Sequence, residues 1–396
     1  MFDFELYVPT KVVFGRGAEK RAGEMVKRAG GTKVLLHYGS VSAEKTGLLS
    51  RIEDSLKAEG VAYCKLGGVV PNPRLSKVRE GVELSQKEGV DFILAVGGGS
   101  VIDSSKAIAY ALADPDNDVW ELFDGTRKKA AGCLPLGAVP TIAAAGSETS
   151  DSCVITNDLN DEKRGYNDDI ARPRFALMNP ELTMTLPAYQ TASGCVDIMM
   201  HTFERYFTQG GNMELTDEIA EGLLRTVVRN ALILRDDPED YDARAEIMWA
   251  GSLSHNGLTG CGIKASDFAS HKMEHELSGM FDVAHGAGLA AIWCSWARYV
   301  CADCTDRFAK YARNVLGVTE GRDDLETALK GIDETEAFFK AIDMPVNLES
   351  LIGRKATDDE CIALGKNCAR ACGGKKGAAK VLYEEDMIEI FRNANR

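Results

Sequence analysis

Three of the chain's six histidines lie close together, at positions 271, 275 and 285. An imidazole can bind a divalent metal, transfer a proton or make a purely structural hydrogen bond. Upstream, Asp197 and His201 stand four residues apart, as His271 and His275 do. Because residues i and i+4 lie on one face of a helix, each pair is expected to point in one direction. Asp197 together with three of these histidines offers a donor set for a first-row divalent metal.

This donor set does not identify the metal. Carboxylate and imidazole without thiolate suit Fe2+, Zn2+, Mn2+ and Ni2+ almost equally. Chance clustering on a wet helix face, or hydrogen-bonded core histidines, are the simpler explanations of the same pattern. His37 ends an apolar run and His255 lies in a helix-to-loop stretch, so we expect both to be structural.

A glycine-rich segment, VGGGSVIDSSK at 96–106, lies between an apolar run and a helical pattern. Glycines at such a turn let backbone amides approach a phosphate, and the helix N-terminus adds partial positive charge. The segment matches neither G-x-G-x-x-G nor the P-loop. A second segment, VPTIAAAGSET at 139–149, is rich in small and hydroxyl residues, as expected where a chain wraps a nucleotide. A tight turn and a linker are the alternative explanations.

The first half of the chain alternates two kinds of segment. Short apolar runs predict strands at 33–38, 61–66 and 91–96, and helical patterns cover 44–59, 71–89 and 100–113. This rhythm predicts a doubly wound parallel sheet. From about residue 186 the long segments are helical. We therefore predict an α/β nucleotide-binding domain over 1–185 and an all-α metal- and substrate-binding domain over 186–396.

Composition narrows the classes of partner. The 396 residues carry a net charge of −14 and no marked basic run, which argues against nucleic acid and anionic membrane. No apolar run reaches the roughly 18–20 residues of a membrane span. The N-terminus lacks the order of a signal peptide, so a cytoplasmic location is expected.

The eleven cysteines are scattered through the chain, unlike those of a small disulfide-rich domain. Cys301 and Cys304 have C-x2-C spacing, and Cys368 and Cys372 are four apart, so a structural zinc site is one interpretation. Free thiols in a reducing cell are the favoured one.

These motifs, in this order, resemble those of the iron-containing (group III) alcohol dehydrogenases. The resemblance runs from PTKVVFG near the start through VVPNP, GGGSVID and AGSE to D-x3-H and H-x3-H-x9-H. It covers nearly the whole chain. YGS at 38–40, KTG at 45–47 and NPELTMTLP at 179–187 resemble the branch of butanol dehydrogenases and NADPH-dependent aldehyde reductases. The family resemblance implies a dehydroquinate synthase-like fold, in which a Rossmann-like doubly wound parallel sheet precedes an all-α C-terminal domain.

The resemblance also implies residue roles and a reaction. Asp197, His201, His271 and His285 match the metal ligands, and His275 matches a nearby histidine that assists proton transfer. Residues that match contacts to the nicotinamide cofactor are Asn72, Gly97, Gly98, Gly99, Ser100, Asp103, Thr141, Ser147 and Lys163. The expected activity is hydride transfer between NAD(P)H and a small aldehyde or primary alcohol, with Fe2+ as the metal. A homodimer is expected.

Two departures from the family pattern bear on the cofactor. Ala144 and Ala145 replace a Thr-Gly or Gly-Thr pair, and Ser40-Val41 replaces a Gly-Gly pair. After the strand at 33–38 come Gly39, Ser40, Val41 and Ser42, with no carboxylate to repel a 2′-phosphate. NAD-specific relatives carry aspartate where this chain has Gly39. We therefore predict NADP(H) over NAD(H), with Gly39, Ser40 and Ser42 near the ribose.

Two other functions fit parts of the pattern. A dehydroquinate synthase-like lyase shares the fold and the metal site, but it needs basic residues for a phosphate-bearing substrate. Around 255–275 the chain offers only Lys264 and Lys272. The second alternative is a catalytically inactive metal-binding protein, and the presence of all four candidate ligands argues against it.

Overall fold

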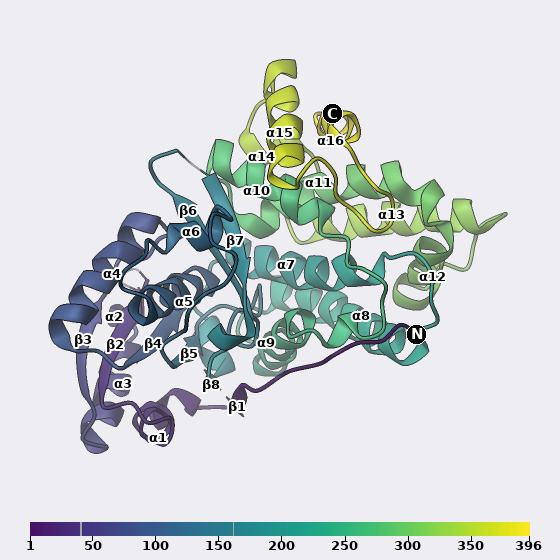
Figure 1. The fold of residues 1–396 in the computed structure, drawn as a ribbon. Helices are drawn as coiled ribbons and strands as arrows, with labels where there is room; N and C mark the ends of the chain where they lie inside the picture. Colours follow the sequence, from purple (N-terminus) through teal and green to yellow (C-terminus); the bar gives the residue numbers. More distant parts are fainter. Residues whose placement is uncertain (40–41, 161) are drawn as a thin grey trace. The chain divides into compact units, whose positions relative to one another are not determined.

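In the computed structural model the chain forms two compact units, Tyr7–Thr185 and a second made of Met1–Leu6 with Leu186–Arg396. The structure describes residues 1–39, 42–160 and 162–396. Figure 1 shows strands and helices alternating in the first unit and helices dominating the second. The predicted combination of a doubly wound α/β region and an all-α region is confirmed.

A six-stranded sheet forms the centre of the first unit, with the order β1-β8-β5-β4-β2-β3. Every pairing in it is parallel. Its strands are β1 (Lys11–Phe14), β2 (Lys33–Tyr38), β3 (Ala62–Leu66), β4 (Phe92–Gly97), β5 (Leu136–Pro140) and β8 (Phe175–Met178). Strand β3 lies on one side of β2, and the next strand along the chain, β4, lies on the other side. The strand order therefore reverses between β2 and β4, and this is the topological switch point at which such folds bind ligands.

Helices cover both faces of this sheet because its central strands are apolar on both sides. Leu94 packs with α1 (Ala22–Arg28) and α3 (Leu48–Ala58), whereas its neighbour Ile93 packs with α4 (Leu75–Glu88) and α5 (Gly99–Ala113). All six residues of β4 are buried. Alternate side chains of one strand therefore serve two separate cores.

The structure corrects two predicted helices. The pattern at 44–59 is two helices, α2 (Ser42–Lys45) and α3, because Gly47 between them has a left-handed φ of 70°. The predicted helix 71–89 begins only at Leu75, since Asn72 between two prolines is itself left-handed, with φ 54°. The short α6 (Trp120–Phe123) and an antiparallel hairpin, β6 (Ser152–Asn157) with β7 (Glu162–Asn167), complete the unit.

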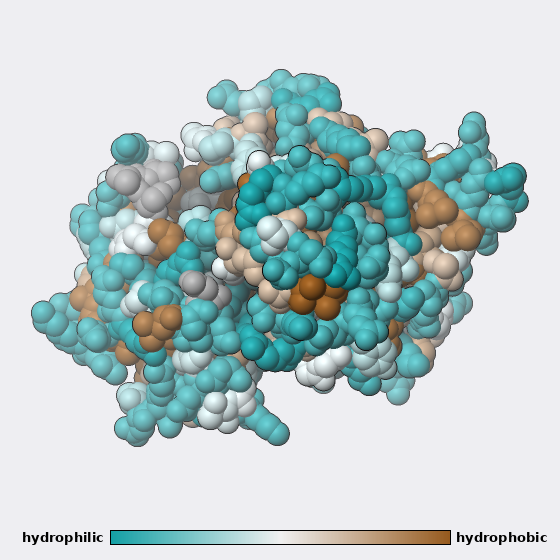
Figure 2. Space-filling view, turned by 90° about the horizontal axis from the view of Figure 1, so that it is seen from above, coloured by the Kyte–Doolittle hydropathy of each residue, from teal (hydrophilic) through white to brown (hydrophobic). Residues whose placement is uncertain are grey.

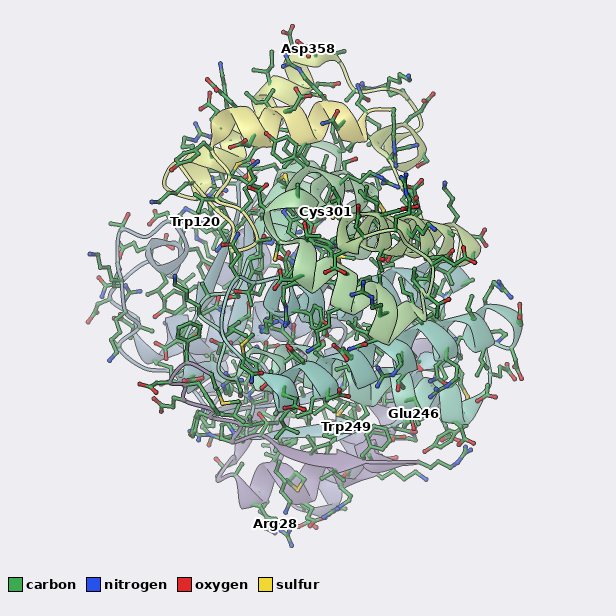
Figure 3. The ribbon with its side chains drawn as sticks, turned by 90° about the vertical axis from the view of Figure 1, so that its right-hand side faces the viewer. Arg28, Trp120, Glu246, Trp249, Cys301 and Asp358 are labelled. Carbon is green, nitrogen blue, oxygen red and sulfur yellow. The ribbon has the colours of Figure 1, made fainter. Side chains whose placement is uncertain are left out.

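The second unit consists of ten α-helices among its described residues. They are α7 (Ala188–Tyr206), α8 (Glu214–Asp236), α9 (Tyr241–His255), α10 (Ala269–Phe281), α11 (His285–Val300), α12 (Thr305–Leu316), α13 (Asp324–Ala341), α14 (Leu348–Ile352), α15 (Asp358–Ala371) and α16 (Glu384–Ala394). Helices α7 and α11 approach closely, because a Cβ on Gly286 would lie 2.0 Å from the Ser193 carbonyl oxygen. Figure 3 shows Glu246 and Trp249 on α9, both of them exposed.

Among the described residues, no helix combines the length and apolar composition that a membrane span needs. The face in Figure 2 is mainly hydrophilic, and its apolar patches are small and separate. The eleven cysteines are free thiols, and eight of them are buried.

Candidate metal and cofactor sites

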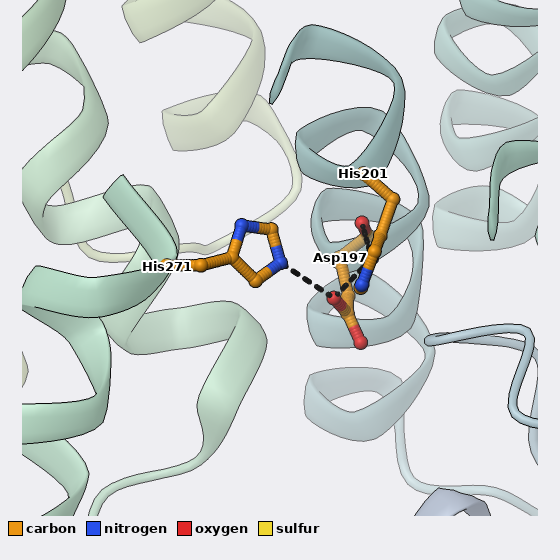
Figure 4. A group of neighbouring side chains, drawn as sticks. All are labelled: Asp197, His201 and His271. Carbon is orange, nitrogen blue, oxygen red and sulfur yellow. Dashed lines mark hydrogen bonds and ion pairs between the residues drawn. The ribbon is translucent and has the colours of Figure 1, made fainter. Parts of the chain in front are cut away.

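The predicted metal ligands come from three helices of the second unit. Asp197 and His201 lie one turn apart on α7, His271 lies in the first turn of α10, and His285 is the first residue of α11. Ligand atoms of Asp197, His201 and His271 lie within 4.8 Å of one another, as Figure 4 shows. All three residues are buried, each with at most 4% of its surface exposed. The structure thus brings together side chains that are 74 residues apart in sequence (197 to 271).

Asp197 Oδ1 is the atom on which the cluster converges. It lies 3.0 Å from His201 Nδ1, 3.9 Å from His271 Nε2 and 3.7 Å from His285 Nε2. Asp197 Oδ1 and His271 Nε2 are both buried without a hydrogen-bond partner, because the nearby His201 Nδ1 donates to the Asp197 carbonyl oxygen at 2.9 Å instead. A buried polar atom without a partner costs free energy, so two of them facing each other at 3.9 Å need a common partner.

A divalent cation fits this gap. Metal–oxygen and metal–nitrogen bonds of about 2.0–2.2 Å place two ligand atoms roughly 3–4 Å apart around one ion. Burial acts to raise the pKa of Asp197, but the surrounding imidazoles outweigh it and hold that pKa well below its usual range. Burial, reinforced by His201 and His285, holds the pKa of His271 well below 6.5. An anionic carboxylate beside a neutral imidazole is the protonation state that binds a metal.

The Nδ1 atoms of the three candidate histidine ligands are all hydrogen-bonded within the protein. His201 Nδ1 donates to the Asp197 carbonyl at 2.9 Å, and His271 Nδ1 donates to Glu204 Oε1 at 2.7 Å. His285 Nδ1 donates to Glu274 Oε2. Burial raises the pKa of Glu204 to about 7.

Two other histidines border the cluster. The ring of His275, one turn after His271 on α10, lies 6.0 Å from the ring of His285. His255, which we expected to be structural, has its ring 3.9 Å from that of His201 and is only 8% exposed. His37 lies in the other unit, where its ring bonds the Leu66 carbonyl and Ser104 Oγ at 2.9 Å each.

Several predicted cofactor residues follow the carboxyl ends of parallel strands, with Gly39 after β2, Gly98 and Gly99 after β4, and Thr141 after β5. A Cβ on Gly98 would lie 2.5 Å from Ile142, and one on Gly99 would lie 3.3 Å from Ser147 Oγ. The chain is closely apposed there, and Thr141 N donates to the Gly97 carbonyl at 3.2 Å. Gly99 and Ser100 open α5, so its N-terminal amides lie at the switch point.

Three polar residues stand beside this loop. Ser147 and Lys163 are buried, and both interact with the Asp103 carboxyl. Asp103 Oδ2 accepts from Val154 N at 3.0 Å, whereas its Oδ1 is buried without a partner. Burial raises the pKa of Asp103 to about 6. Gly39 follows β2, and its carbonyl accepts from Gly68 N at 2.8 Å.

The structure gives fewer contacts for three other predicted cofactor residues, Asn72, Ser40 and Ser42. Asn72 is buried and left-handed, next to Pro73, whose carbonyl accepts from Thr156 N at 2.8 Å. Ser40, and the side chain of Ser42, lie outside the part of the chain that the structure describes.

Glu204 and Glu274 were missed by sequence reasoning. Asp197, His201 and Glu204 follow i, i+4, i+7 spacing and form a polar stripe on a helix that is otherwise largely apolar and buried. Glu274 follows His271 by three residues. A search for buried-face carboxylates beside candidate ligands would have found both glutamates.

Comparison with known proteins agrees with this geometry. Residues 9–180 match the family model of the iron-containing alcohol dehydrogenases, and residues 191–395 match the model of the family's C-terminal region. The chain therefore belongs to the iron-containing alcohol dehydrogenase family. It is an oxidoreductase of the alcohol dehydrogenase and aldehyde reductase class, and the lyase alternative finds no support.

Similar individual proteins cover nearly the whole chain. NADH-dependent butanol dehydrogenase A of Clostridium acetobutylicum is 38% identical over 100% of both chains. NADPH-dependent aldehyde reductase YqhD of Escherichia coli is 36% identical over 88% of this chain and 89% of its own. The crystal structure of NADH-dependent butanol dehydrogenase A from Thermotoga maritima has a TM-score of 0.95 at 37% identity, covering 100% of this chain and 99% of that one.

Proposed function

We propose that this chain is a metal-dependent oxidoreductase that transfers a hydride between NADP(H) and a small aldehyde or primary alcohol. The observation that carries the metal dependence is the pair of buried, unpartnered atoms Asp197 Oδ1 and His271 Nε2, 3.9 Å apart. Similarity to butanol dehydrogenases and an aldehyde reductase supports the substrate class.

Asp197, His201, His271 and His285 would hold the metal, with Fe2+ favoured over Zn2+, Mn2+ and Ni2+. When bound, the metal would polarise the substrate oxygen as a Lewis acid while the nicotinamide exchanges the hydride. The chain's own part is to present one anionic carboxylate and three imidazoles on three packed helices. We expect the activity to decay in air and to return when Fe2+ and a reductant are added. Full activity after days in air would indicate Zn2+ instead.

The glycine loop would bind the cofactor diphosphate. Gly97, Gly98 and Gly99 leave the backbone amides accessible, and the N-terminus of α5 supplies unpaired N–H groups. Ser100, Thr141 and Ser147 add hydroxyl donors beside the loop. A side chain at position 98 would have to displace Ile142, because a Cβ there would lie 2.5 Å from that residue's side chain.

His275 is our candidate for moving a proton to or from the substrate oxygen, since its ring lies beside that of His285 and it belongs to the same helix as His271. We expect His275→Ala to keep its metal by elemental analysis and to lose about 10²–10⁴-fold in turnover, most at high pH where protons are scarce. Loss of metal would make His275 a ligand, and unchanged kinetics would make it structural.

The preference for NADP(H) rests on the end of β2. Gly39 carries no side chain that could repel a 2′-phosphate. The nearest acid along the chain, Glu44, accepts a hydrogen bond from Tyr38 Oη at 2.8 Å, which ties that carboxylate to β2. One relative named above is NADPH-dependent and two are NADH-dependent, so measurement must separate the two.

A substrate panel tests the proposed function. Protein reconstituted with Fe2+ under anaerobic conditions is mixed with NADPH or NADH and with short aldehydes, and with the oxidised cofactors and primary alcohols. We expect stoichiometric cofactor consumption, with the higher kcat/KM for NADPH. Cofactor that stays bound and is recycled would support a lyase, and no absorbance change with any substrate would support an inactive metal-binding protein.

Assembly and location are further parts of the proposal. We propose a cytoplasmic homodimer, which sedimentation analysis of the purified chain would test by its mass. The free buried thiols are compatible with a reducing compartment.

A further inference from the structure

Glu204 joins two structural elements at one carboxylate. It projects from α7, is 2% exposed, and its Oε1 accepts from both the backbone N of His271 at 3.0 Å and the ring Nδ1 of the same residue at 2.7 Å. Phe268, the residue immediately before α10, has a left-handed backbone conformation, and its side chain does not cap the helix. Glu204 therefore anchors the start of α10 and fixes the rotation of the His271 ring at the same time.

Glu274 has the same relation to His285. It projects from α10, is fully buried, and accepts from His285 Nδ1 and from Ser278 Oγ. Space for it depends on a glycine of α11, because a Cβ on Gly288 would lie 2.9 Å from Glu274 Cγ. The carboxylate is thus clamped between α10 and the first turn of α11.

We propose that Glu204 and Glu274 are positioning residues that hold two metal-binding imidazoles, those of His271 and His285, with Nε2 directed at Asp197. This inference rests on the proposed metal centre. Each carboxylate accepts a hydrogen bond from the Nδ1–H group, which selects the ring tautomer that leaves Nε2 as the ligand. The resulting geometry is convergent, with both Nε2 atoms within 3.9 Å of Asp197 Oδ1.

A purely structural role is the competing explanation, because buried carboxylates with several donors also stabilise a fold. Glu221 provides the matched case. It is 1% exposed, accepts from Tyr206 Oη at 2.7 Å and from Asn314 Nδ2 at 2.9 Å, and binds no predicted ligand. The same Glu→Gln change at Glu221 alters burial and charge without touching a metal-binding ring.

The experiment compares Glu204→Gln, Glu274→Gln and Glu221→Gln in the full chain. Co2+ is the probe, its dissociation constant is measured by competition with a chelator, and its visible absorption reports ligand geometry. The unfolding midpoint of each metal-free protein is measured beside it. We expect the first two variants to bind Co2+ about 10–100-fold more weakly with an altered spectrum, and Glu221→Gln to lower only the unfolding midpoint.

A fourth variant leaves every donor and acceptor in place. Gly288→Ala should push Glu274 aside and weaken Co2+ binding as Glu274→Gln does, while Glu204 still holds His271. Co2+ affinities of Glu204→Gln and Glu274→Gln within twofold of wild type would overturn the positioning role. Equal weakening in Glu221→Gln would also overturn it, by showing a general effect of destabilisation. A wild-type chain that binds no Co2+ would overturn the proposed metal centre itself.

Discussion

Two buried charged clusters of the helical unit differ in whether all their polar atoms have hydrogen-bond partners. Around Asp217, the Arg307 guanidinium makes two bonds of 2.7 Å to the carboxylate and Lys310 adds a third at 2.6 Å. Arg307 also lies over the Tyr206 ring at 4.2 Å. Around Asp197, by contrast, distances of 3.7 and 3.9 Å to His285 and His271 are too long for hydrogen bonds.

The difference separates a structural network from a binding site. None of the side-chain atoms of Asp217, Arg307 and Lys310 is among the buried unpartnered atoms of the described residues, whereas Asp197 Oδ1 and His271 Nε2 are. A cluster whose polar atoms are all paired stabilises the fold by itself. A cluster that converges on an open gap gains its stabilisation only when a ligand fills the gap.

Removing a ligand should have the largest effect on activity. We expect His271→Ala to lose at least about 100-fold in kcat/KM, more than the loss typical of the residues that only orient a ligand. The far-ultraviolet circular dichroism should stay unchanged, because the backbone N of residue 271 still donates to Glu204 at the start of α10. Normal turnover with metal retained would contradict the assignment.

Breaking the other cluster should act on stability instead. Asp217→Asn leaves the buried Arg307 without its anion, and we expect the free energy of unfolding to fall by about 3–5 kcal/mol, measured by urea denaturation. Metal content should be unchanged. The control is Asp236→Asn, which alters an exposed pair with Arg235 and should leave the free energy of unfolding nearly unchanged.

His37 offers a test that depends on pH in the nucleotide-binding unit. Burial lowers its pKa from 6.5 to about 4. The unfolded chain therefore binds more protons between these values, so stability is present at pH 7 and falls as the pH drops from 6.5 towards 4, by about 3 kcal/mol. We expect His37→Gln to flatten this part of the stability–pH curve, and an unchanged slope would show that the ring is already charged in the fold.

The smallest effect is expected for Gly39→Asp, which should change the preference between NADPH and NADH. A Cβ on Gly39 would lie 3.5 Å from Val101 and 3.6 Å from the Val69 carbonyl, which are ordinary contacts, so Gly39→Asp fits the fold. Its charge should disfavour NADPH by roughly 1–3 kcal/mol, about one to two powers of ten in the ratio of kcat/KM values. A wild type that already prefers NADH tenfold, or a variant with an unchanged ratio, would refute the preference.

The parallel sheet was predictable because β2, β3 and β4 are continuous apolar runs of the length of a strand. The hairpin β6–β7 was not predictable, since its second strand, Glu162–Asn167, is polar and shows no alternation of apolar and polar residues. Gly47 and Asn72 also escaped prediction, because their left-handed φ values interrupt sequences whose periodicity is otherwise helical.

At the site, the spacing of Asp197 and His201 was enough to predict a shared face of a helix, and the family resemblance supplied His271 and His285. The partners on the far side of the rings were not predicted. Glu204 meets His271 only because α7 packs against α10, and a contact between residues 67 positions apart leaves no local periodicity.

Metal stoichiometry tests the central claim most directly. Metal-free protein is titrated anaerobically with Fe2+ and analysed by elemental analysis after removal of unbound ion, in parallel for the wild type and for Asp197→Asn. The account predicts one iron per chain in the wild type and none retained in the variant, with both proteins folded. Equal iron retention in the two would contradict it, because the ion would then be held by residues other than the cluster around Asp197.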